Sequence, residues 1–154
     1  MTDIVDPSTR SRMMRSIRAQ DTRPELMLRR YLHSLGYRFR LHRKDLPGSP
    51  DIVLPRHKLA IFVHGCFWHR HPGCFYTTTP QSRQDFWQEK FLTNIRRDRQ
   101  ACVELERMGW RVLVVWECGF KHTIERLSDI PLLIESASLY QEWPAIPPRR
   151  PSGT

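Results

Sequence analysis

Residues 51–63, DIVLPRHKLAIFV, contain the two runs that decide the fold. Residues 51–54 and 59–63 are short, rich in β-branched side chains, and separated by the turn-forming segment 55–58. Continuous apolar runs of this length are typical of strands that are buried on both faces. The pattern therefore predicts an antiparallel hairpin in the interior of a sheet.

Further strands are expected on either side of this hairpin. Apolar and polar residues alternate over residues 37–42, which predicts a half-buried strand, and residues 46–50 form a turn. Residues 110–116 are a continuous apolar run, which predicts another buried strand. The sheet should therefore draw its strands from both sides of the hairpin in the sequence.

Helical spacing marks three segments around these strands. One helix begins near Pro24 and ends at Gly36, a long one spans residues 83–108, and a weaker one spans residues 124–139. Because helices and strands alternate, we expect an α/β fold with a mixed β-sheet flanked by helices.

The length of 154 residues favours one domain, which we place at residues 1–142. Residues 1–20 are rich in Arg and carry helical spacing, so they are expected to form a basic N-terminal helical arm. Residues 143–154 are rich in Pro and are expected to be a disordered tail. Residues 65–79 show no hydrophobic periodicity and are expected to be a long ordered loop that needs a stabilising cross-link.

The charge balance points to a polyanionic partner. Lys and Arg number 25 against 16 Asp and Glu, which gives a net charge of +9 with neutral His. Cationic side chains release counterions when they meet phosphates, although a basic surface can also serve solubility alone. No run approaches the roughly 18 apolar residues that span a bilayer, and no export signal is evident, so a cytoplasmic protein is expected.

The loop over residues 65–79 holds a metal-ligand pattern. Three of its residues are Cys66, His71 and Cys74, and Cys118 follows the last predicted strand. Soft ligands with short spacers plus a distant fourth ligand are typical of a closed tetrahedral zinc site. The alternative is a set of buried or idle thiols. Cys102 lies on the apolar stripe of the long helix and is expected to be a buried hydrophobe.

Asp51 and two imidazoles carry the expected chemistry. A carboxylate at the start of a core strand suits Mg²⁺, which binds through one or two carboxylates and keeps several waters, although a single Asp there is often only a turn residue. His64 ends the facing strand and His69 follows it closely. The three can provide a metal ligand, a base and a positive charge for phosphodiester hydrolysis.

Two acidic residues are candidates for supporting roles. Asp98 falls on the apolar stripe of the long helix, where an unpartnered charge is costly, so it is either salt-bridged at the rim of the core or part of the site. Asn94 projects beside it, one turn earlier. Glu25 lies in the first turn of its helix, where the helix dipole explains an acid equally well.

Large aromatic residues are unusually placed. Phe67 and Trp68 lie between Cys66 and His69 in a polar loop, and Trp87 lies at the start of the long helix. Aromatic wedges inserted between base steps are one way to open a distorted duplex. The alternative is that one of them packs under the loop.

Four blocks of sequence resemble the very-short-patch repair endonuclease family. They are PD at 50–51, VHGCFWH at 63–69, NI-x-x-DR at 94–99, and GWRVLVVWEC at 109–118. The likeness runs from about residue 11 to residue 118. It implies a single nuclease domain with a restriction-endonuclease-like mixed sheet, a structural zinc and a magnesium active site. It also implies nicking of DNA 5′ of the thymine in a T·G mismatch.

The resemblance also implies roles for individual residues. Asp51 would hold Mg²⁺ with the backbone carbonyl of Val63, and His69 would be the general base. The supporting active-site groups would be His64, Glu25 and Asp98, the zinc ligands Cys66, His71, Cys74 and Cys118, and the intercalating residues Phe67, Trp68 and Trp87. In the wider nuclease superfamily an acid and a Lys usually follow the Asp, where this chain has Phe62 and His64, so Asp51 is left as the main protein carboxylate on the metal.

Two alternatives to this function stay open at this point. One is another nuclease of the same fold, such as a restriction or junction-cleaving enzyme, and the other is a non-catalytic, zinc-stabilised DNA-binding module. The expected partner is double-stranded DNA with a T·G mismatch, with possible contacts to other repair proteins and a nucleoid-associated location. A mismatch is asymmetric and gives no reason for a two-fold dimer, so a monomer is expected.

Overall fold

The structure is a computed structural model, and it describes residues 21–148. The predicted basic arm over residues 1–20 and the tail residues 149–154 lie outside the described residues. In chain order the elements are α2 (Arg23–Ser34), β1 (Arg40–Leu41), β2 (Ile52–Leu54), η1 (Pro55–His57), β3 (Leu59–His64), α3 (Cys66–His69), α4 (Gln84–Arg107), β4 (Arg111–Trp116), α5 (Cys118–His122), η2 (Ile124–Ser128), α6 (Asp129–Glu135) and β5 (Tyr140–Trp143).

The strands form one five-stranded sheet in the order β1-β2-β3-β4-β5. The predicted hairpin is confirmed, because β2 and β3 pair antiparallel with Ile52 opposite Ile61. β3 and β4 pair in parallel, which places His64 opposite Trp116 at the end of the ladder. Antiparallel and parallel pairs occur together, so the predicted mixed sheet is also confirmed.

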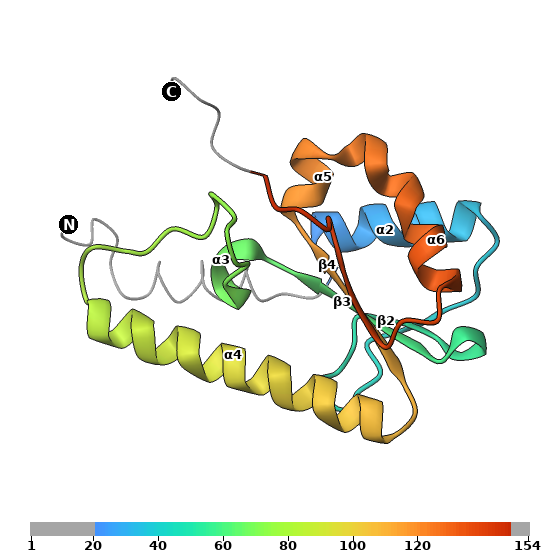
Figure 1. Cartoon of the computed structure of the whole chain (residues 1–154), viewed down its shortest axis with the longest axis horizontal. Coiled ribbons are helices and arrows are strands. Elements are labelled where there is room, and N and C mark those ends of the chain that lie inside the picture. Colours follow the sequence, from blue (N-terminus) through green and yellow to red (C-terminus); the bar gives the residue numbers. More distant parts are fainter. Residues whose placement is uncertain (1–20, 149–154) are drawn as a thin grey trace.

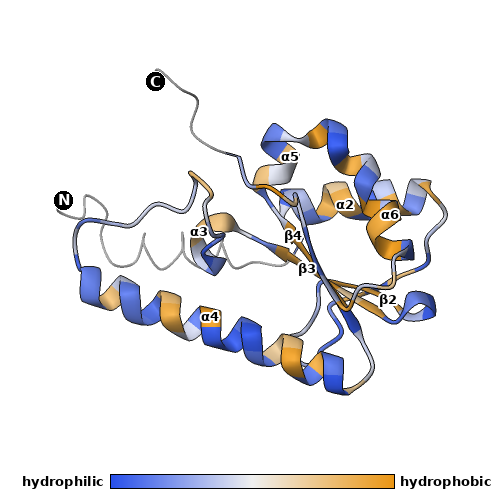
Figure 2. Ribbon diagram, in the orientation of Figure 1, coloured by the Kyte–Doolittle hydropathy of each residue, from blue (hydrophilic) through white to orange (hydrophobic). Residues whose placement is uncertain are grey.

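Helices cover both faces of the sheet (Figure 1). α2, α5 and α6 lie on one face and α4 lies on the other. Successive residues of β3 alternate between the two cores: Leu59 and Ile61 join the first cluster, and Ala60 and Phe62 join the second. Burial on both faces explains why the strands appear as continuous apolar runs in the sequence and in Figure 2.

α2 begins where the sequence predicts. Thr22 caps it by accepting a hydrogen bond from the backbone N–H of Glu25, and Pro24 fits the first turn because its missing N–H would have no helical partner there. Leu28 and Leu32 are fully buried against the sheet. The helix also buries the side chain of Glu25, which is only 2% exposed.

α4 confirms the predicted long helix and crosses the second face of the sheet (Figure 1). Phe91 and Leu105 are its buried apolar anchors. Gly109 follows the helix with φ +85°, a left-handed conformation that glycine adopts at no steric cost. No helix within residues 21–148 is long and apolar enough to cross a bilayer.

Three local predictions need correction. In the segment predicted as a strand over residues 37–42, only Arg40 and Leu41 pair with β2, and both are exposed. The predicted helix over residues 124–139 is instead η2 followed by the seven-residue α6. Pro131 explains this break, because Pro is tolerated in the first turn of a helix and not in its interior. The predicted loop over 65–79 contains the short helix α3.

The last strand continues one residue past the expected boundary at residue 142. Tyr140–Trp143 form the parallel edge strand β5, and Trp143 is 2% exposed. Its indole N–H donates to the backbone carbonyl of Arg126 at 3.1 Å, and its ring fills the space over Gly119, where a Cβ atom would lie 2.3 Å away. Burial of this large ring outweighs the Pro-rich composition around it, so Trp143 belongs to the domain core.

Candidate active site and metal centre

The structure brings the four predicted zinc ligands together. Cys66, His71, Cys74 and Cys118 are all buried, and their ligand atoms lie within 4.8 Å of one another. His71 Nδ1 lies 3.7 Å from Cys66 Sγ and 3.5 Å from Cys118 Sγ. Tetrahedral zinc with bonds of about 2.3 Å to sulfur and about 2.0–2.1 Å to nitrogen requires sulfur–nitrogen distances of about 3.6 Å. The cluster therefore has the dimensions of a metal site.

The protonation chemistry of this cluster also favours a bound cation. All four cysteines of the chain are free thiols. Burial lowers the pKa of His71 to about 4, so its imidazole is neutral and has a lone pair for a metal. A hydrogen bond with Cys118 and burial both raise the pKa of the Cys66 thiol. Thiolates become stable in such a place only when a cation compensates their charge. Cys102 lies outside the cluster, half-buried on α4.

The short helix α3 connects this cluster to a neighbouring cavity. Cys66 opens α3 inside the cluster, and its backbone N–H donates to Glu117 Oε1 at 3.1 Å. His71 follows the helix, and its N–H donates to the Cys66 carbonyl at 3.0 Å. His69 lies between these two ligands but lines the cavity instead. The metal cluster therefore fixes the backbone that carries His69.

The cavity has a volume of about 350 Å³ and collects the predicted catalytic side chains. They come from five elements or element ends of the fold. The predicted residues that line it are Glu25, Asp51, Val63, His64, Trp68, His69, Asn94 and Asp98.

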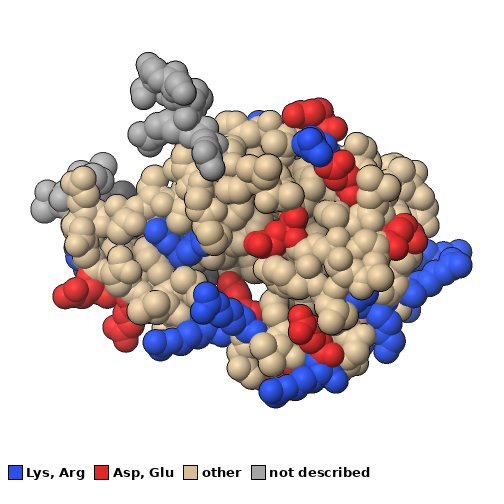
Figure 3. Space-filling model, viewed as in Figure 1, with Lys and Arg blue, Asp and Glu red and all other residues tan. Residues whose placement is uncertain are grey.

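On the face in Figure 3, Lys and Arg side chains are spread among acidic ones rather than gathered in a single block.

Asp98 is the partner of His69. Its Oδ2 lies 2.7 Å from His69 Nδ1, and the two side chains are 28% and 31% exposed. A carboxylate only accepts hydrogen bonds, so Nδ1 carries the proton and donates a hydrogen bond to Asp98. The lone pair on Nε2 is then free to act as a base. The charge of Asp98 on the apolar stripe of α4 is thus explained by this pair.

His64 supports the ring of His69. The two imidazoles stack with a centroid distance of 3.8 Å and an interplanar angle of 5°. Burial holds the pKa of His64 well below its usual value, so the ring is neutral. His64, His69 and Asp98 lie close enough together to hold a metal. Lone pairs of imidazole lie in the ring plane, however, so those of two stacked rings run side by side and do not converge on one ion.

Asp51 is a desolvated carboxylate at the edge of the same cavity. Its Oδ2 accepts a hydrogen bond from the backbone N–H of Val63 at 2.8 Å. Burial, with the negative charge of Glu25 as a smaller cause, raises the pKa of Asp51 to about 7. A carboxylate in such surroundings is stabilised by a nearby cation, and Mg²⁺ binds through one or two carboxylates.

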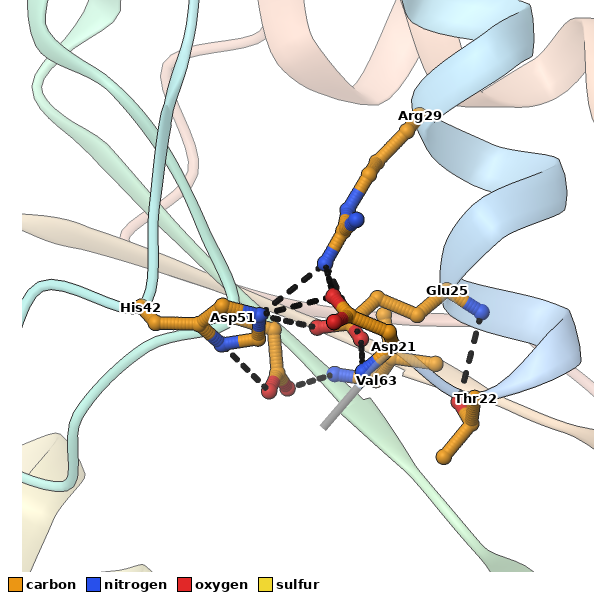
Figure 4. A network of polar contacts seen from close by, with 7 residues as sticks. All are labelled: Asp21, Thr22, Glu25, Arg29, His42, Asp51 and Val63. Atoms are coloured by element: carbon orange, nitrogen blue, oxygen red, sulfur yellow. Dashed lines mark hydrogen bonds and ion pairs between the residues drawn. The ribbon is translucent and has the colours of Figure 1, made fainter. Parts of the chain in front are cut away.

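Glu25 lies behind Asp51 and is held by the start of α2 (Figure 4). Its Oε2 accepts the backbone N–H of Asp21 at 2.5 Å and lies 3.3 Å from Arg29 Nη2. Its Oε1 is buried and has no hydrogen-bond partner within residues 21–148. Its nearest polar neighbour there is His42 Nε2 at 3.5 Å, so Oε1 can still accept a hydrogen bond from a water in the cavity.

Sequence comparisons agree with this geometry. Residues 2–75 match the family model described as DNA mismatch endonuclease Vsr. The DNA mismatch endonuclease Vsr of Escherichia coli is 43% identical over 143 residues, which cover 93% of this chain and 88% of that protein.

The chain belongs to the Vsr family. Two further relatives are named type II nicking enzymes. V.XorIIP of Xanthomonas oryzae pv. oryzae is 53% identical over 118 residues, covering 77% of this chain and 86% of the relative. V.NmeAIP of Neisseria meningitidis serogroup A is 42% identical over 140 residues, covering 89% of this chain and 99% of the relative.

The three aromatic residues singled out in this Vsr-family sequence form one cluster between α3 and α4. Phe67 lies 5.1 Å from Trp68 and 5.8 Å from Trp87 between ring centroids, and the two Trp rings lie 5.5 Å apart. Trp68 is buried, whereas Phe67 and Trp87 are half-buried. Asn94 fixes α3 against α4 by donating from its side chain to the Trp68 carbonyl at 3.2 Å.

The cavity includes residues that the sequence analysis of this Vsr-family chain missed. Glu117 lines it and also holds the start of α3, so this one carboxylate contacts both sites. An acid directly between a buried strand and Cys118, a predicted zinc ligand, was the available signal. Arg97 lines the cavity from α4, one turn after Asn94. His42 lies behind Asp51, and nothing in its surroundings in the sequence marks it.

Proposed function

We propose that this Vsr-family protein is a Mg²⁺-dependent DNA endonuclease that nicks one strand on the 5′ side of the thymine in a T·G mismatch. The observation that carries the proposal is the shared cavity: Asp51 and the His69–Asp98 pair line it together, from elements far apart in the sequence. The relatives support it, since they are named a DNA mismatch endonuclease and nicking enzymes. The proposal takes the mixed sheet as a restriction-endonuclease-like core.

Asp51 and the backbone carbonyl of Val63 would hold the Mg²⁺ ion. When bound, Mg²⁺ neutralises charge on the scissile phosphate and makes its phosphorus a better electrophile. Asp51 fits this role because its carboxylate is partly desolvated and is aimed by the Val63 N–H. The remaining ligands would be waters and phosphate oxygens, as is usual for this ion.

His69 would act on the attacking water. Asp98 holds the proton on Nδ1, which leaves Nε2 to take a proton from the water, and the Asp98 charge then stabilises the imidazolium. His64 keeps the ring in place by stacking on it. Oε1 of Glu25, which accepts no hydrogen bond within residues 21–148, would accept one from a water in the cavity.

The Cys66–His71–Cys74–Cys118 cluster would hold a structural zinc. Four buried protein ligands leave no open position for a substrate, which distinguishes a structural site from a catalytic one. Its contribution to catalysis would be indirect, through the placement of α3 and His69.

The aromatic cluster would read the mismatch. Phe67 and Trp87 are half-buried and contact Trp68, which lines the cavity, so they can enter a base stack that a mismatch has weakened. The net charge of +9 favours binding to the duplex backbone.

A nicking assay tests this function. We expect Mg²⁺-dependent cleavage of one strand of a duplex with a T·G pair, 5′ of the thymine, and much slower cleavage of the matched T·A and C·G duplexes. Equal cleavage of matched or branched DNA would indicate another nuclease of the same fold. Binding without cleavage, across several divalent metals, would indicate a DNA-binding module.

A further inference from the structure

A polar network behind Asp51 contains two residues that the mechanism above does not use, Arg29 and His42 (Figure 4). Asp21, Glu25 and His42 have ligand-type atoms within 4.8 Å of one another, a spacing that a metal can use. Arg29 already supplies positive charge there, because its Nη2 forms ion pairs with both Asp21 and Glu25. Arg29 Nη2 thus contacts all three of these residues itself, and it offsets one of the two carboxylate charges.

His42 is held against Asp51 by its backbone. Its N–H donates to the Asp51 carbonyl oxygen at 3.1 Å, directly after the β1–β2 pairing ends. Its φ is +47°, a left-handed conformation that is uncommon outside glycine and that persists where the surroundings hold it in place. The side chain is 15% exposed and points at the Asp51 carboxylate (Figure 4).

Arg29 determines which ring nitrogen of His42 carries the proton. Arg29 Nη2 lies 2.9 Å from His42 Nε2, and a guanidinium is always a donor. Two donors do not approach to this distance, so Nε2 presents its lone pair and the ring proton is on Nδ1. The carboxylates of Asp21 and Glu25 lie 3.3 Å and 3.5 Å from Nε2 and favour a proton there, but both contacts are longer than that of Arg29.

The Nδ1–H of His42 faces Asp51. Nδ1 lies 3.9 Å from Asp51 Oδ1, while Oδ2 of the same carboxylate accepts from Val63. The distance is longer than a direct hydrogen bond, so the interaction of the N–H with Oδ1 is electrostatic. His42 thus places a positive dipole end on one carboxylate oxygen, and the sheet backbone holds the other.

We propose that Arg29 and His42 are positioning residues for the metal-binding carboxylate: Arg29 fixes the Nδ1–H tautomer of His42, and that N–H orients Asp51. This inference rests on the proposed role of Asp51 and therefore on the proposed function. Partners of this kind, one step away from a metal ligand, typically change metal affinity about 10–100-fold when they are removed.

Ring-nitrogen NMR on the metal-free, full-length protein at neutral pH tests the tautomer without any cleavage. We expect His42 to carry its ring proton on Nδ1, and we expect Arg29→Ala to convert it to a mixture of tautomers. Arg30→Ala, on an exposed position of the same helix, is the matched control and should leave the His42 signals unchanged. A proton on Nε2 in the unmodified protein overturns the inference.

The Mg²⁺ dependence of nicking tests the orienting role. His42→Ala should raise the Mg²⁺ concentration for half-maximal nicking about tenfold, with the rate at saturating Mg²⁺ within about twofold of the unmodified protein. His42→Gln should restore most of the affinity, because its amide offers an acceptor to Arg29 and a donor to Asp51. Equal Mg²⁺ dependence of the two variants overturns the orienting role.

The two proposals fail in different ways. If the unmodified protein cleaves no DNA, the proposed function fails, and Mg²⁺ titration followed by the backbone NMR signal of Val63 still measures metal affinity in both variants. If nicking is normal but neither readout depends on Arg29 or His42, only the positioning role fails. Thermal unfolding of each variant separates loss of folding from either outcome.

Discussion

His69 and His71 lie two residues apart but belong to different kinds of site. His71 is 4% exposed, stacks on Trp116 and directs Nδ1 at two thiols. His69 has a side chain that is 31% exposed, stacks on His64 and directs Nδ1 at a carboxylate. Both residues are histidines of the same short segment. Exposure and hydrogen-bond partner therefore distinguish a buried candidate metal ligand from a side chain that can contact solvent and substrate.

The contrast extends to the whole of the two sites. The Cys/His cluster is buried and uses only protein ligands, so it suits a permanent metal that stabilises the fold. The cavity around Asp51 has an incomplete ligand set and a half-exposed base, so it suits an exchangeable ion and a substrate. Substitutions in the Cys/His cluster should therefore reduce stability, whereas substitutions in the cavity around Asp51 should reduce activity.

The largest expected effect is that of Asp51→Asn on nicking. The amide cannot provide a negative oxygen to Mg²⁺, and loss of several kcal/mol of transition-state stabilisation lowers the rate by about a thousandfold or more. The zinc content should stay at that of the unmodified protein, as measured by metal analysis of the same sample. Loss of zinc together with activity would contradict the separation of the Cys/His cluster from the catalytic cavity.

Cys118→Ser tests the Cys/His cluster. It removes a fully buried ligand, so we expect loss of bound zinc and a fall in the unfolding temperature of about 10 °C or more. Cys102→Ser is the matched control, since this half-buried thiol lies outside the cluster and should keep the zinc. Stoichiometric zinc in the Cys118 variant would show that the cluster is not the binding site.

His69→Ala and His71→Ala compare the two imidazoles directly. Loss of the general base in His69→Ala should lower the nicking rate about a hundredfold with zinc retained. His71→Ala should lose zinc and stability first, and nicking only as a consequence. The same metal loss in both variants would contradict the division of roles between them.

Phe67→Ala should weaken discrimination between T·G and T·A duplexes by about tenfold, because aromatic–base stacking contributes about 1–3 kcal/mol per base. Phe86→Ala is the matched control, since Phe86 is an exposed neighbour on α4. The measurement is the ratio of nicking rates on the two duplexes. An equal loss in both variants would place the reading of the mismatch elsewhere.

The smallest expected effect concerns stability and pH. Burial raises the pKa of Asp51 to about 7, so between about pH 4 and 7 the folded, metal-free protein binds a proton that the unfolded chain does not. The free energy of unfolding should therefore fall as pH rises through this window. Asp51→Asn should lack that decline and exceed the unmodified protein by about 1–2 kcal/mol at pH 8. Parallel stability curves for the two proteins in urea unfolding would refute the raised pKa.

Local patterns were enough to predict the hairpin, α4 and the ligand spacing of Cys66, His71 and Cys74. Each depends on periodicity or on neighbours in sequence, which composition and spacing report directly. Local patterns could not predict the partner of Asp98, because the His69–Asp98 contact depends on how α4 crosses the sheet. The structure resolves that choice.

Other features depend on contacts between distant residues. β5 is a short edge strand in a Pro-rich stretch, and it forms because Trp143 fits over Gly119 of α5. His42 ends an alternating run and gains its place only through a left-handed backbone and a neighbour, Arg29, from α2. Propensity and pattern carry no record of such tertiary contacts.

The most direct test of the two-site account is to measure zinc content and nicking on one sample before and after brief treatment with a chelator. We expect zinc to remain at one equivalent, nicking of the T·G duplex to stop, and Mg²⁺ alone to restore it. Full nicking after chelation, or activity that returns only when zinc is added back, would contradict the separation of a closed structural site from an open catalytic one.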